Sequence, residues 1–329
     1  MKIAVDAMGG DFAPREIVQG ALQAVKEYQA QVILVGDENK ILAELGDVPH
    51  NNIDIVHASE VINMGEHPAS AVRKKKDSSV IKANQLVKEG EAKAVVSAGS
   101  TGAAMAASLL VLGRIKGIYR PAIASVLPNV QGGTVLLDIG ANVDCKPQYL
   151  LQFAIMGNLY ANKILGIKNP RVGLLNIGEE DTKGNELTLA SFPLLEQAGI
   201  NFIGNAEGRD IFNGAVDVVV CDGFIGNIVL KSSEGLASTL KNMIKQEISG
   251  SLLAKLGIAM ILPSLKKIQK RTDYAEYGGA PLLGINGISI ICHGSSRAKA
   301  VKNAIRVAME SVNNRLVAAI GEDIEKVKI

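Results

Sequence analysis

The sequence is poor in aromatic residues and contains no tryptophan. Phe, Trp and Tyr make up only 4% of its 329 residues, which leaves few flat side chains on which nucleobases could stack. The charges nearly balance, because 35 Lys and Arg residues and 33 Asp and Glu residues give a net charge of only +2. Without stacking side chains or a positive field, the chain is not expected to bind nucleic acid.

Cysteine is scarce, and long apolar runs are absent. Cys145, Cys221 and Cys292 lie far apart, and the last two stand in apolar runs typical of buried strands. An odd number without metal-ligand spacing indicates reduced thiols and argues against disulfides or a zinc site. The first apolar run is interrupted at Asp6, too early for a signal peptide, and no run approaches the length of a membrane span. We therefore expect a cytoplasmic protein.

Several functional fingerprints are also lacking. The sequence has no G-x-G-x-x-G after its first apolar run and no G-x-x-x-x-G-K-[ST] anywhere, which argues against dinucleotide and P-loop nucleotide sites. It has neither G-x-S-x-G nor a convincing Cys and His pair. A covalent enzyme nucleophile is therefore not expected.

The sequence does contain the rhythm of an α/β protein. Hydrophobic residues make up 47%, and short β-branched runs alternate with segments of helical period. This alternation predicts a doubly wound, mostly parallel sheet flanked by helices. The expected strands are 2–7, 31–36, 53–58, 92–99, 121–128, 133–140, 170–178, 200–208, 216–223 and 287–294, and the expected helices include 15–28, 39–45, 103–112 and 147–165. No Ser/Gly-rich or Pro-rich linker divides the chain, so residues 1–329 are expected to form a single domain with a protruding helical excursion at about 231–281.

The turns that follow the strands are rich in Gly and polar residues, at the positions where open α/β sheets bind ligands. The best anion candidate is the turn formed by Gly99, Ser100, Thr101 and Gly102. Glycines allow close approach, the hydroxyls donate hydrogen bonds, and the next helix offers free N–H groups. An ordinary helix cap explains this segment equally well. The similar turn from Gly294 to Arg297 favours a simple cap.

Four other polar residues stand out. Lys183, in an acidic turn beside Asn185, could contact a phosphate or a developing oxyanion, or be a solvated surface charge. Asn227 could donate its amide to an oxyanion or cap the next helix. His67 could handle protons, although a structural hydrogen bond in its loop is the favoured interpretation.

Two surface segments have patterns of their own. The basic run that contains Arg73, Lys74 and Lys75 is either a solvated helix face or a docking site for an acidic protein. The segment from Leu252 to Leu262 is apolar on nearly every side and is followed by basic residues, as in segments that rest on anionic membranes. A dimer contact or a groove for an acyl chain would explain it equally well.

Eight motifs in order along the chain resemble those of the bacterial phosphate acyltransferases of phospholipid synthesis. They are DAMGGD from Asp6, MGEHPASAVRKKKDSS from Met64, SAGSTGA from Ser97, LDIGANVD from Leu137, NIGEEDTKGNE from Asn176, GNAEGRD from Gly204, CDGFIGNIVLK from Cys221 and YGGAPLLGINGISIICHGSS from Tyr277. These enzymes convert acyl-acyl carrier protein and inorganic phosphate into acyl phosphate.

The resemblance implies a three-layer α/β/α fold similar to that of phosphotransacetylases and isocitrate-dehydrogenase-like enzymes. It also implies a homodimer with no metal or organic cofactor. Peripheral contact with the inner face of the cell membrane is implied as well, where a membrane acyltransferase would consume the product.

On this basis we expect a single pocket. Phosphate would bind at Gly99 to Gly102, Lys183 would neutralise charge, and Asn185 or Asn227 would support the oxyanion. The residues expected to complete the pocket are Asp6, Gly9, Gly10, Asp11, His67, Asp138 and Asn142, and those expected to dock the carrier protein are Arg73, Lys74 and Lys75. Three alternatives remain open, namely an acetyltransferase that uses coenzyme A, a dehydrogenase and a non-catalytic scaffold for carrier protein.

Overall fold

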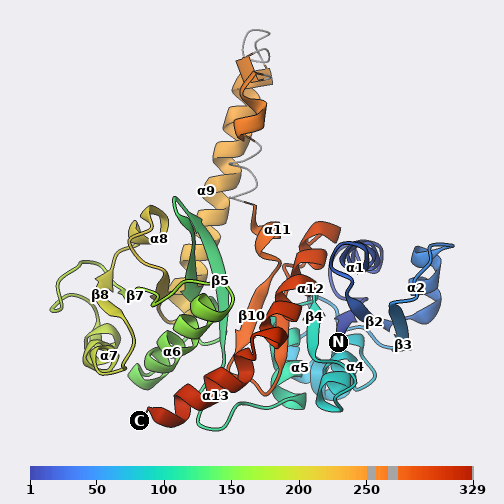
Figure 1. The fold of residues 1–329 in the computed structure, drawn as a ribbon, viewed down its shortest axis with the longest axis horizontal. Coiled ribbons are helices and arrows are strands. Elements are labelled where there is room, and N and C mark those ends of the chain that lie inside the picture. Colours follow the sequence, from blue (N-terminus) through green and yellow to red (C-terminus); the bar gives the residue numbers. More distant parts are fainter. Residues whose placement is uncertain (250–256, 259, 266–272, 328–329) are drawn as a thin grey trace.

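A computed structural model describes residues 1–249, 257–258, 260–265 and 273–327 of the chain. Within these residues the backbone forms one eleven-stranded sheet in the order β3-β2-β1-β4-β11-β10-β5-β6-β9-β7-β8 (Figure 1). The strands are β1 (Lys2–Asp6), β2 (Gln31–Gly36), β3 (Ile53–His57), β4 (Ala94–Ser97), β5 (Ala122–Asn129), β6 (Gly132–Leu137), β7 (Val172–Leu175), β8 (Phe202–Ala206), β9 (Val218–Val220), β10 (Ala280–Leu283) and β11 (Ile288–Ile291).

The sheet consists of two parallel groups joined through antiparallel strands. Strands β3, β2, β1, β4 and β11 are parallel, and so are β6, β9, β7 and β8. Between the groups, β10 and β5 run antiparallel to both of their neighbours. The register pairs Ser97 with both Asp6 and Ile291, so the carboxyl ends of β1, β4 and β11 lie side by side. Those three ends carry the polar turns of the first group.

Helices cover both faces of the sheet, which confirms the predicted three-layer α/β/α arrangement. Alternate residues of β1 point to opposite sides, and Ile3 packs with α1 and α12 whereas Ala4 packs with α4. The helices are α1 (Arg15–Tyr28), α2 (Glu38–Leu45), α3 (Pro68–Lys74), α4 (Ser79–Lys88), α5 (Thr101–Val111), α6 (Pro147–Lys163), α7 (Glu186–Glu196), α8 (Asp210–Asn213), α9 (Gly223–Ser249), α11 (Tyr274–Tyr277), α12 (Ala298–Asn313) and α13 (Leu316–Lys326).

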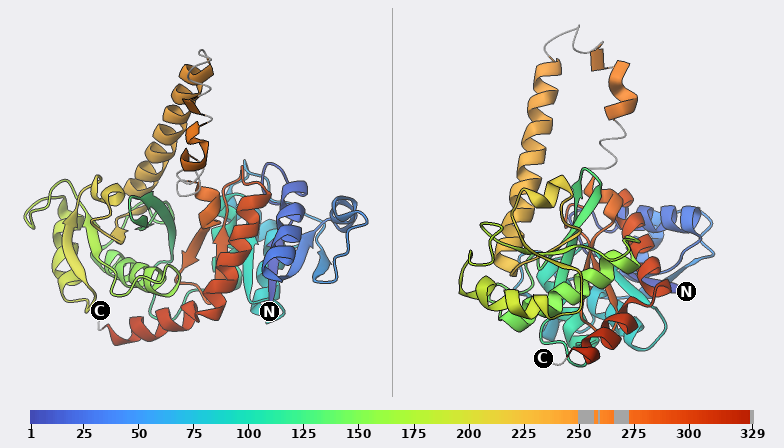
Figure 2. Two further views of the ribbon diagram at one scale, coloured as in Figure 1. Left: turned by 45° about the horizontal axis from the view of Figure 1, so that its top comes forward. Right: turned by 60° about the vertical axis from the view of Figure 1, so that its left-hand side comes forward.

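One helix leaves the layered body. Helix α9 stands away from the sheet in all three views (Figures 1 and 2). It begins at Gly223, eight residues before the predicted start of the excursion, because the turn after β9 leads directly into it. Much of the apolar segment predicted from Leu252 to Leu262 lies outside the described residues, although Met260, Ile261 and Leu262 are described and exposed. None of the helices among the described residues is long and apolar enough to cross a bilayer. The single-domain organisation stays a prediction.

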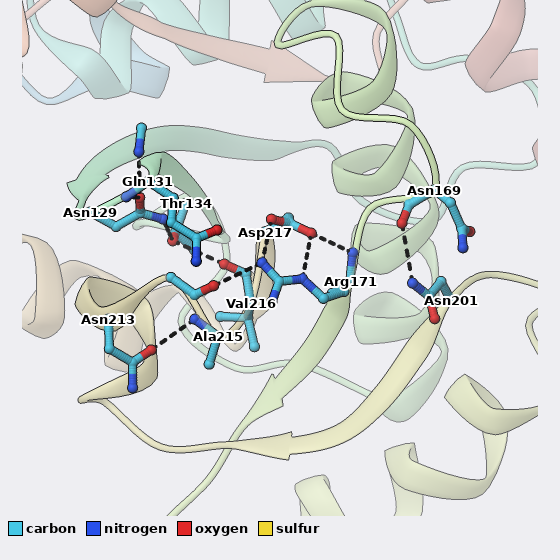
Figure 3. A network of polar contacts seen from close by, with 12 residues as sticks. Asn129, Gln131, Thr134, Asn169, Arg171, Asn201, Asn213, Ala215, Val216 and Asp217 are labelled. Atoms are coloured by element: carbon cyan, nitrogen blue, oxygen red, sulfur yellow. Dashed lines mark hydrogen bonds and ion pairs between the residues drawn. The ribbon is translucent and has the colours of Figure 1, made fainter.

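A polar network braces the second parallel group at the amino ends of its strands (Figure 3). Arg171 donates from Nε to Asp217 Oδ2 at 3.0 Å, and from Nη2 to Oδ1 at 3.0 Å and to the Gly214 carbonyl at 2.8 Å. The buried Thr134 hydroxyl donates to the Ile211 carbonyl at 2.8 Å. Because these groups lie at the strand ends opposite to the polar turns, we assign them to the fold and not to a site.

Candidate functional site

The predicted anion turn lies between β4 and α5. Helix α5 begins at Thr101, with Ser100 in the N-cap position. Within the described residues, Ser100 makes no side-chain capping hydrogen bond, so its hydroxyl is not committed to the helix. The first N–H groups of an α-helix have no partner inside the helix and carry its positive end. The turn therefore presents the donors that an inorganic oxyanion requires.

The turn after β1 packs directly against this anion turn. A Cβ atom on Gly9 would lie 2.5 Å from Asp6 Oδ2 and 2.7 Å from the Gly99 nitrogen, so only glycine fits there. Gly10 has a φ of +111°, and the N–H of Asp11 donates to the Gly294 carbonyl at 2.9 Å. The β1, β4 and β11 turns thus form one contiguous unit, as the sequence predicts for Gly9, Gly10 and Asp11.

Asp6 lies beneath these turns and is only 3% exposed. Its Oδ2 accepts from the Ser97 hydroxyl at 2.7 Å, and its Oδ1 accepts from the Met8 N–H at 3.2 Å. Burial raises the pKa of Asp6 above its usual value, while hydrogen bonds from Ser79 and Ser97 oppose that shift. Asp6 therefore organises the turns from below.

A small cavity opens at the centre of this unit. Its polar or glycine lining is Asp6, Gly9, Ser79, Ser97, Gly99 and Ser100, and its apolar lining is Val61, Ile62, Val80, Ala103 and Ala104. Ser79 and Ser97 were not among the predicted site residues. Only their positions in the sequence could have pointed to a role in the site. Ser97 ends a strand immediately before the Gly turn, and Ser79 begins a helix after a basic run.

Helix α3 borders the anion turn. A Cβ atom on Gly102 would lie 2.7 Å from Pro68 Cγ, so the starts of α3 and α5 touch. His67 is exposed in the N-cap position of α3, and among the described residues its side chain makes no capping hydrogen bond. His67 is therefore near the turn but outside the lining of the cavity.

The basic run at the end of α3 divides into two kinds of side chain. Arg73 and Lys74 are exposed in the last turn of the helix. Lys75 differs from the prediction of a docking residue, because its ammonium donates to Glu66 Oε1 and to the Val61 carbonyl, both at 2.7 Å. Lys75 therefore ties the end of α3 to the preceding loop.

A second polar group forms where β6 and β9 end. The Asp138 carboxylate is fully buried and accepts from the Ile123 N–H at 3.0 Å, the Ala141 N–H at 3.1 Å and the Asn142 N–H at 2.6 Å. Burial raises the pKa of Asp138, and these hydrogen bonds oppose the shift. Asn142 also donates from Nδ2 to Asp138 Oδ2 at 3.0 Å and to the Pro121 carbonyl at 2.8 Å. Both predicted residues therefore shape this turn.

Helix α9 begins on this second group. A Cβ atom on Gly226 would lie 1.9 Å from the Asp138 carbonyl oxygen, and one on Gly140 would lie 3.8 Å from the Asn227 side chain. Asn227 is thus exposed beside the Asp138 turn. Ile139 and Ala141, from the same turn, pack against the apolar cluster that α3, α4 and α5 form. The Asp138 turn and α5 therefore border the same apolar cluster.

Lys183 and Asn185 lie in a third group, after β7. Lys183 is exposed, and its carbonyl accepts from Asn176 Nδ2 at 3.0 Å. Asn185 caps α7, with Oδ1 accepting from the Thr188 N–H at 2.9 Å and its own N–H donating to Thr188 Oγ1 at 3.0 Å.

The third group is well separated from the anion turn along the sheet. Five strands lie between β4 and β7, which is about 29 Å along the sheet at about 4.8 Å per step. Within the described part of the chain, no hydrogen bond or ion pair joins the Lys183 loop to the anion turn. The residues predicted for a single pocket thus fall into three groups at the ends of different strands.

Cysteine chemistry does not contribute to these groups. Burial raises the pKa of both Cys145 and Cys292 to about 12, so neither thiol is a ready thiolate. The described residues contain no group of three His, Cys, Asp or Glu placed to hold a metal ion. The chemistry available in these turns is therefore hydrogen bonding and charge stabilisation.

Comparisons with known proteins agree on one family. The family model described as "Fatty acid synthesis protein" matches residues 1–319. Proteins named phosphate acyltransferase match along nearly their whole length: that of Pelotomaculum thermopropionicum is 68% identical, covering 100% of this chain and 96% of the relative, and that of Heliobacterium modesticaldum is 61% identical, covering 98% of each.

Among solved structures, a phosphotransacetylase from Streptococcus pyogenes shares the fold, with a TM-score of 0.64 at 18% identity over 95% of this chain and 94% of that one. A branched-chain phosphotransacylase from Enterococcus faecalis gives a TM-score of 0.60 at 15% identity, over 95% and 99% of the two chains. With the family model and these long, highly identical relatives in agreement, the chain belongs to the fatty acid synthesis protein family.

Proposed function

We propose that this protein transfers a fatty acyl group from acyl-acyl carrier protein to inorganic phosphate and so forms acyl phosphate for phospholipid synthesis. The observation that carries the proposal is the identity of 68% over the whole chain to a protein named phosphate acyltransferase. The turn from Gly99 to Gly102, with its free helix N-terminus, supports the choice of phosphate as acceptor.

The proposed reaction needs no enzyme nucleophile. A phosphate oxygen attacks the thioester carbonyl, a tetrahedral oxyanion forms, and the carbon–sulfur bond then breaks to release the carrier thiolate. A thiol with a pKa near 8.5 is a good leaving group, so the protein mainly has to align the reactants and stabilise the oxyanion. The high pKa values of the Cys145 and Cys292 thiols are consistent with a direct transfer.

The proposed roles follow the three groups of residues. Gly99, Ser100, Thr101 and Gly102 would hold phosphate, and Asn227, beside the Asp138 turn, would donate its amide to the oxyanion. One such donor contributes roughly 3 to 4 kcal/mol to the transition state. Lys183 remains the proposed charge-neutralising cation. Asn185 is the weaker oxyanion candidate, because its side-chain oxygen already caps α7.

The test measures acyl phosphate directly. Purified full-length protein is mixed with long-chain acyl-acyl carrier protein and isotopically labelled phosphate, and the product is identified by mass spectrometry. Thr101→Ala and Lys183→Ala are each expected to lower the rate by about tenfold or more, because each removes an interaction with charge. Lys163→Ala, at the exposed end of α6, is the matched control and should keep the wild-type rate.

Two outcomes would count against the proposal. If wild-type protein forms no labelled acyl phosphate, the function is wrong, and turnover of acetyl-coenzyme A without carrier protein would favour the coenzyme A alternative. If the product forms but Thr101→Ala and Lys183→Ala both retain full activity, the function stands and the proposed site is wrong.

We also propose that Arg73 and Lys74 dock the acidic carrier protein. Both are exposed at the end of α3, and the start of the same helix touches Gly102. A carrier bound there would bring its thioester toward the anion turn. Lys75 is left out of this surface, because it is paired with Glu66.

The remaining partners concern α9 and the chain beyond it. Leu236, Leu240, Met243 and Ile244 are between 50% and 62% exposed along one side of the helix, which supports a homodimer in which a second copy covers them. The exposed side chains of Met260, Ile261 and Leu262 support peripheral contact with the membrane, where a membrane acyltransferase would use the product. From the scattered cysteines and the resemblance to the phosphate acyltransferases, we also propose a cytoplasmic location and a reaction without a metal or organic cofactor.

A further inference from the structure

The Asp6 carboxylate lies where three separate parts of the chain meet. Met8 donates from the turn after β1 and Ser97 donates from the end of β4, while Ser79, at the start of α4, lowers the pKa of the carboxyl. All three elements border the small cavity beside the anion turn. One buried carboxylate therefore fixes their positions relative to one another.

Ser97 connects this carboxylate to the anion turn. Its hydroxyl hydrogen is donated to Asp6 Oδ2 at 2.7 Å, which leaves the lone pairs of its oxygen free to accept the Gly99 N–H at 3.2 Å. The side chain is only 3% exposed, so water does not compete for either bond. Asp6 thus fixes the direction of the Ser97 hydroxyl, and Ser97 in turn fixes the orientation of the Gly99 peptide.

Ser97 does not itself have room to touch phosphate. The cavity that it lines measures about 10 Å³, which accommodates about one water molecule. An anion would lie outside that cavity, against the N–H groups of Ser100 and Thr101. Any influence of Ser97 on the anion must therefore pass through the backbone of the turn.

We propose that Ser97, held by Asp6, is a positioning residue that presets the turn from Gly99 to Thr101 for phosphate. The inference rests on the proposed function. Preset donors bind an anion without reorganisation, so the loss of Ser97 lowers the affinity for phosphate more than the rate of the chemical step. A purely structural serine would instead lower stability and leave phosphate affinity unchanged.

The experiment compares two buried serines, one at the end of β4 before α5 and one near the end of α5. Ser97→Ala breaks the link to Gly99, whereas the control Ser108→Ala removes a buried hydrogen bond of 3.0 Å from α5 to Ser289 in β11, away from the cavity lining. For Ser97→Ala we expect the KM for phosphate to rise about tenfold, the effect of one lost hydrogen bond. The kcat at saturating phosphate should stay within about threefold of wild type. Ser108→Ala should change the melting temperature but not this KM.

Direct binding of inorganic phosphate to the full-length protein, measured by titration calorimetry, gives a readout without turnover. If Ser97→Ala and Ser108→Ala bind phosphate equally well and show the same KM, the inference is overturned while the proposed function stands. If wild-type protein neither binds nor uses phosphate, both fail. Should Ser97→Ala not fold, Ser97→Cys keeps the side-chain volume with a weaker acceptor, and it must raise the KM for phosphate if the inference is right.

Discussion

Two buried aspartates have the same role in two different turns. Asp6 is the last residue of β1 and Asp138 follows β6, and each accepts from several N–H or O–H donors while excluded from water. Burial raises the pKa of both carboxyls, because the charged form loses its hydration. From the sequence, both residues were predicted to support the pocket. The sequence could not reveal Ser79 and Ser97, because their partnership with Asp6 depends on how α4 and β4 pack.

A third acidic residue gives a prediction for stability. Asp217 has a lowered pKa: burial alone would raise it, but the hydrogen bonds and charge of Arg171 outweigh burial. A folded-state pKa below the unfolded value of about 3.9 stabilises the fold above that pH, and this stabilisation is lost as the pH falls through the folded value. We expect Asp217→Asn to cost about 1 to 2 kcal/mol at pH 7.

Urea unfolding of wild type and Asp217→Asn across the pH range checks this prediction. The difference between the two proteins should be constant at neutral pH and shrink below about pH 4. A difference that stays the same down to pH 2, or one that grows, would show that the charge of Asp217 is not the source of the stability.

Among the elements, those with strong periodicity were predicted well and those without it were not. The predicted bounds 15–28 and 31–36 coincide with α1 and β2, because each has an uninterrupted apolar pattern between polar ends. β10 was missed, since it has only four residues, includes Pro281 and follows two glycines. The antiparallel direction of β10 and β5 was also missed, because the amino-acid composition of an apolar strand does not reveal whether it runs parallel or antiparallel to its neighbours.

The base of α9 offers a matched pair of substitutions. A Cβ atom on Gly226 would lie 1.9 Å from the Asp138 carbonyl oxygen, whereas one on Gly235, in the same helix, would meet no described atom within 4 Å. We expect Gly226→Ala to destabilise the protein by about 2 kcal/mol or more through overpacking, and Gly235→Ala to stabilise it by up to about 1 kcal/mol through helix propensity. Thermal unfolding of the two variants measures both effects. Equal melting temperatures would mean that α9 is not seated on the Asp138 turn.

Across the whole molecule, strand order decides which turns can meet. The order of the turns along the chain does not reveal their order across the sheet, where five strands lie between β4 and β7. The turns at Asp6 and Gly99, which were both expected in one pocket, lie side by side because their strands are neighbours. Lys183 was expected in the same pocket, but it stands in a separate group. The activity test therefore has to decide the role of Lys183, as it does that of the anion turn.

Self-association is the prediction that belongs to the whole molecule. Leu240 lies on the exposed apolar side of α9, and Asn242, two residues on, points to a different side of the helix. If a second copy covers the apolar side, Leu240→Glu should weaken the dimer by about 100-fold in Kd, while Asn242→Glu should leave it intact. Sedimentation equilibrium of both variants against wild type gives the masses. A wild-type monomer, or a dimer equally weakened by both changes, would contradict the proposed interface.

Gly226 packs so closely against the Asp138 peptide that the first turn of the protruding helix α9 has no room to shift. A long helix that is packed rigidly at its first turn moves as one body, so a displacement of its far end also displaces the residues at its base. In α9 these residues are the turn beside Asn227. A partner that binds the far end of α9 would therefore move the turn beside Asn227, which we assign to the oxyanion of the reacting carbonyl.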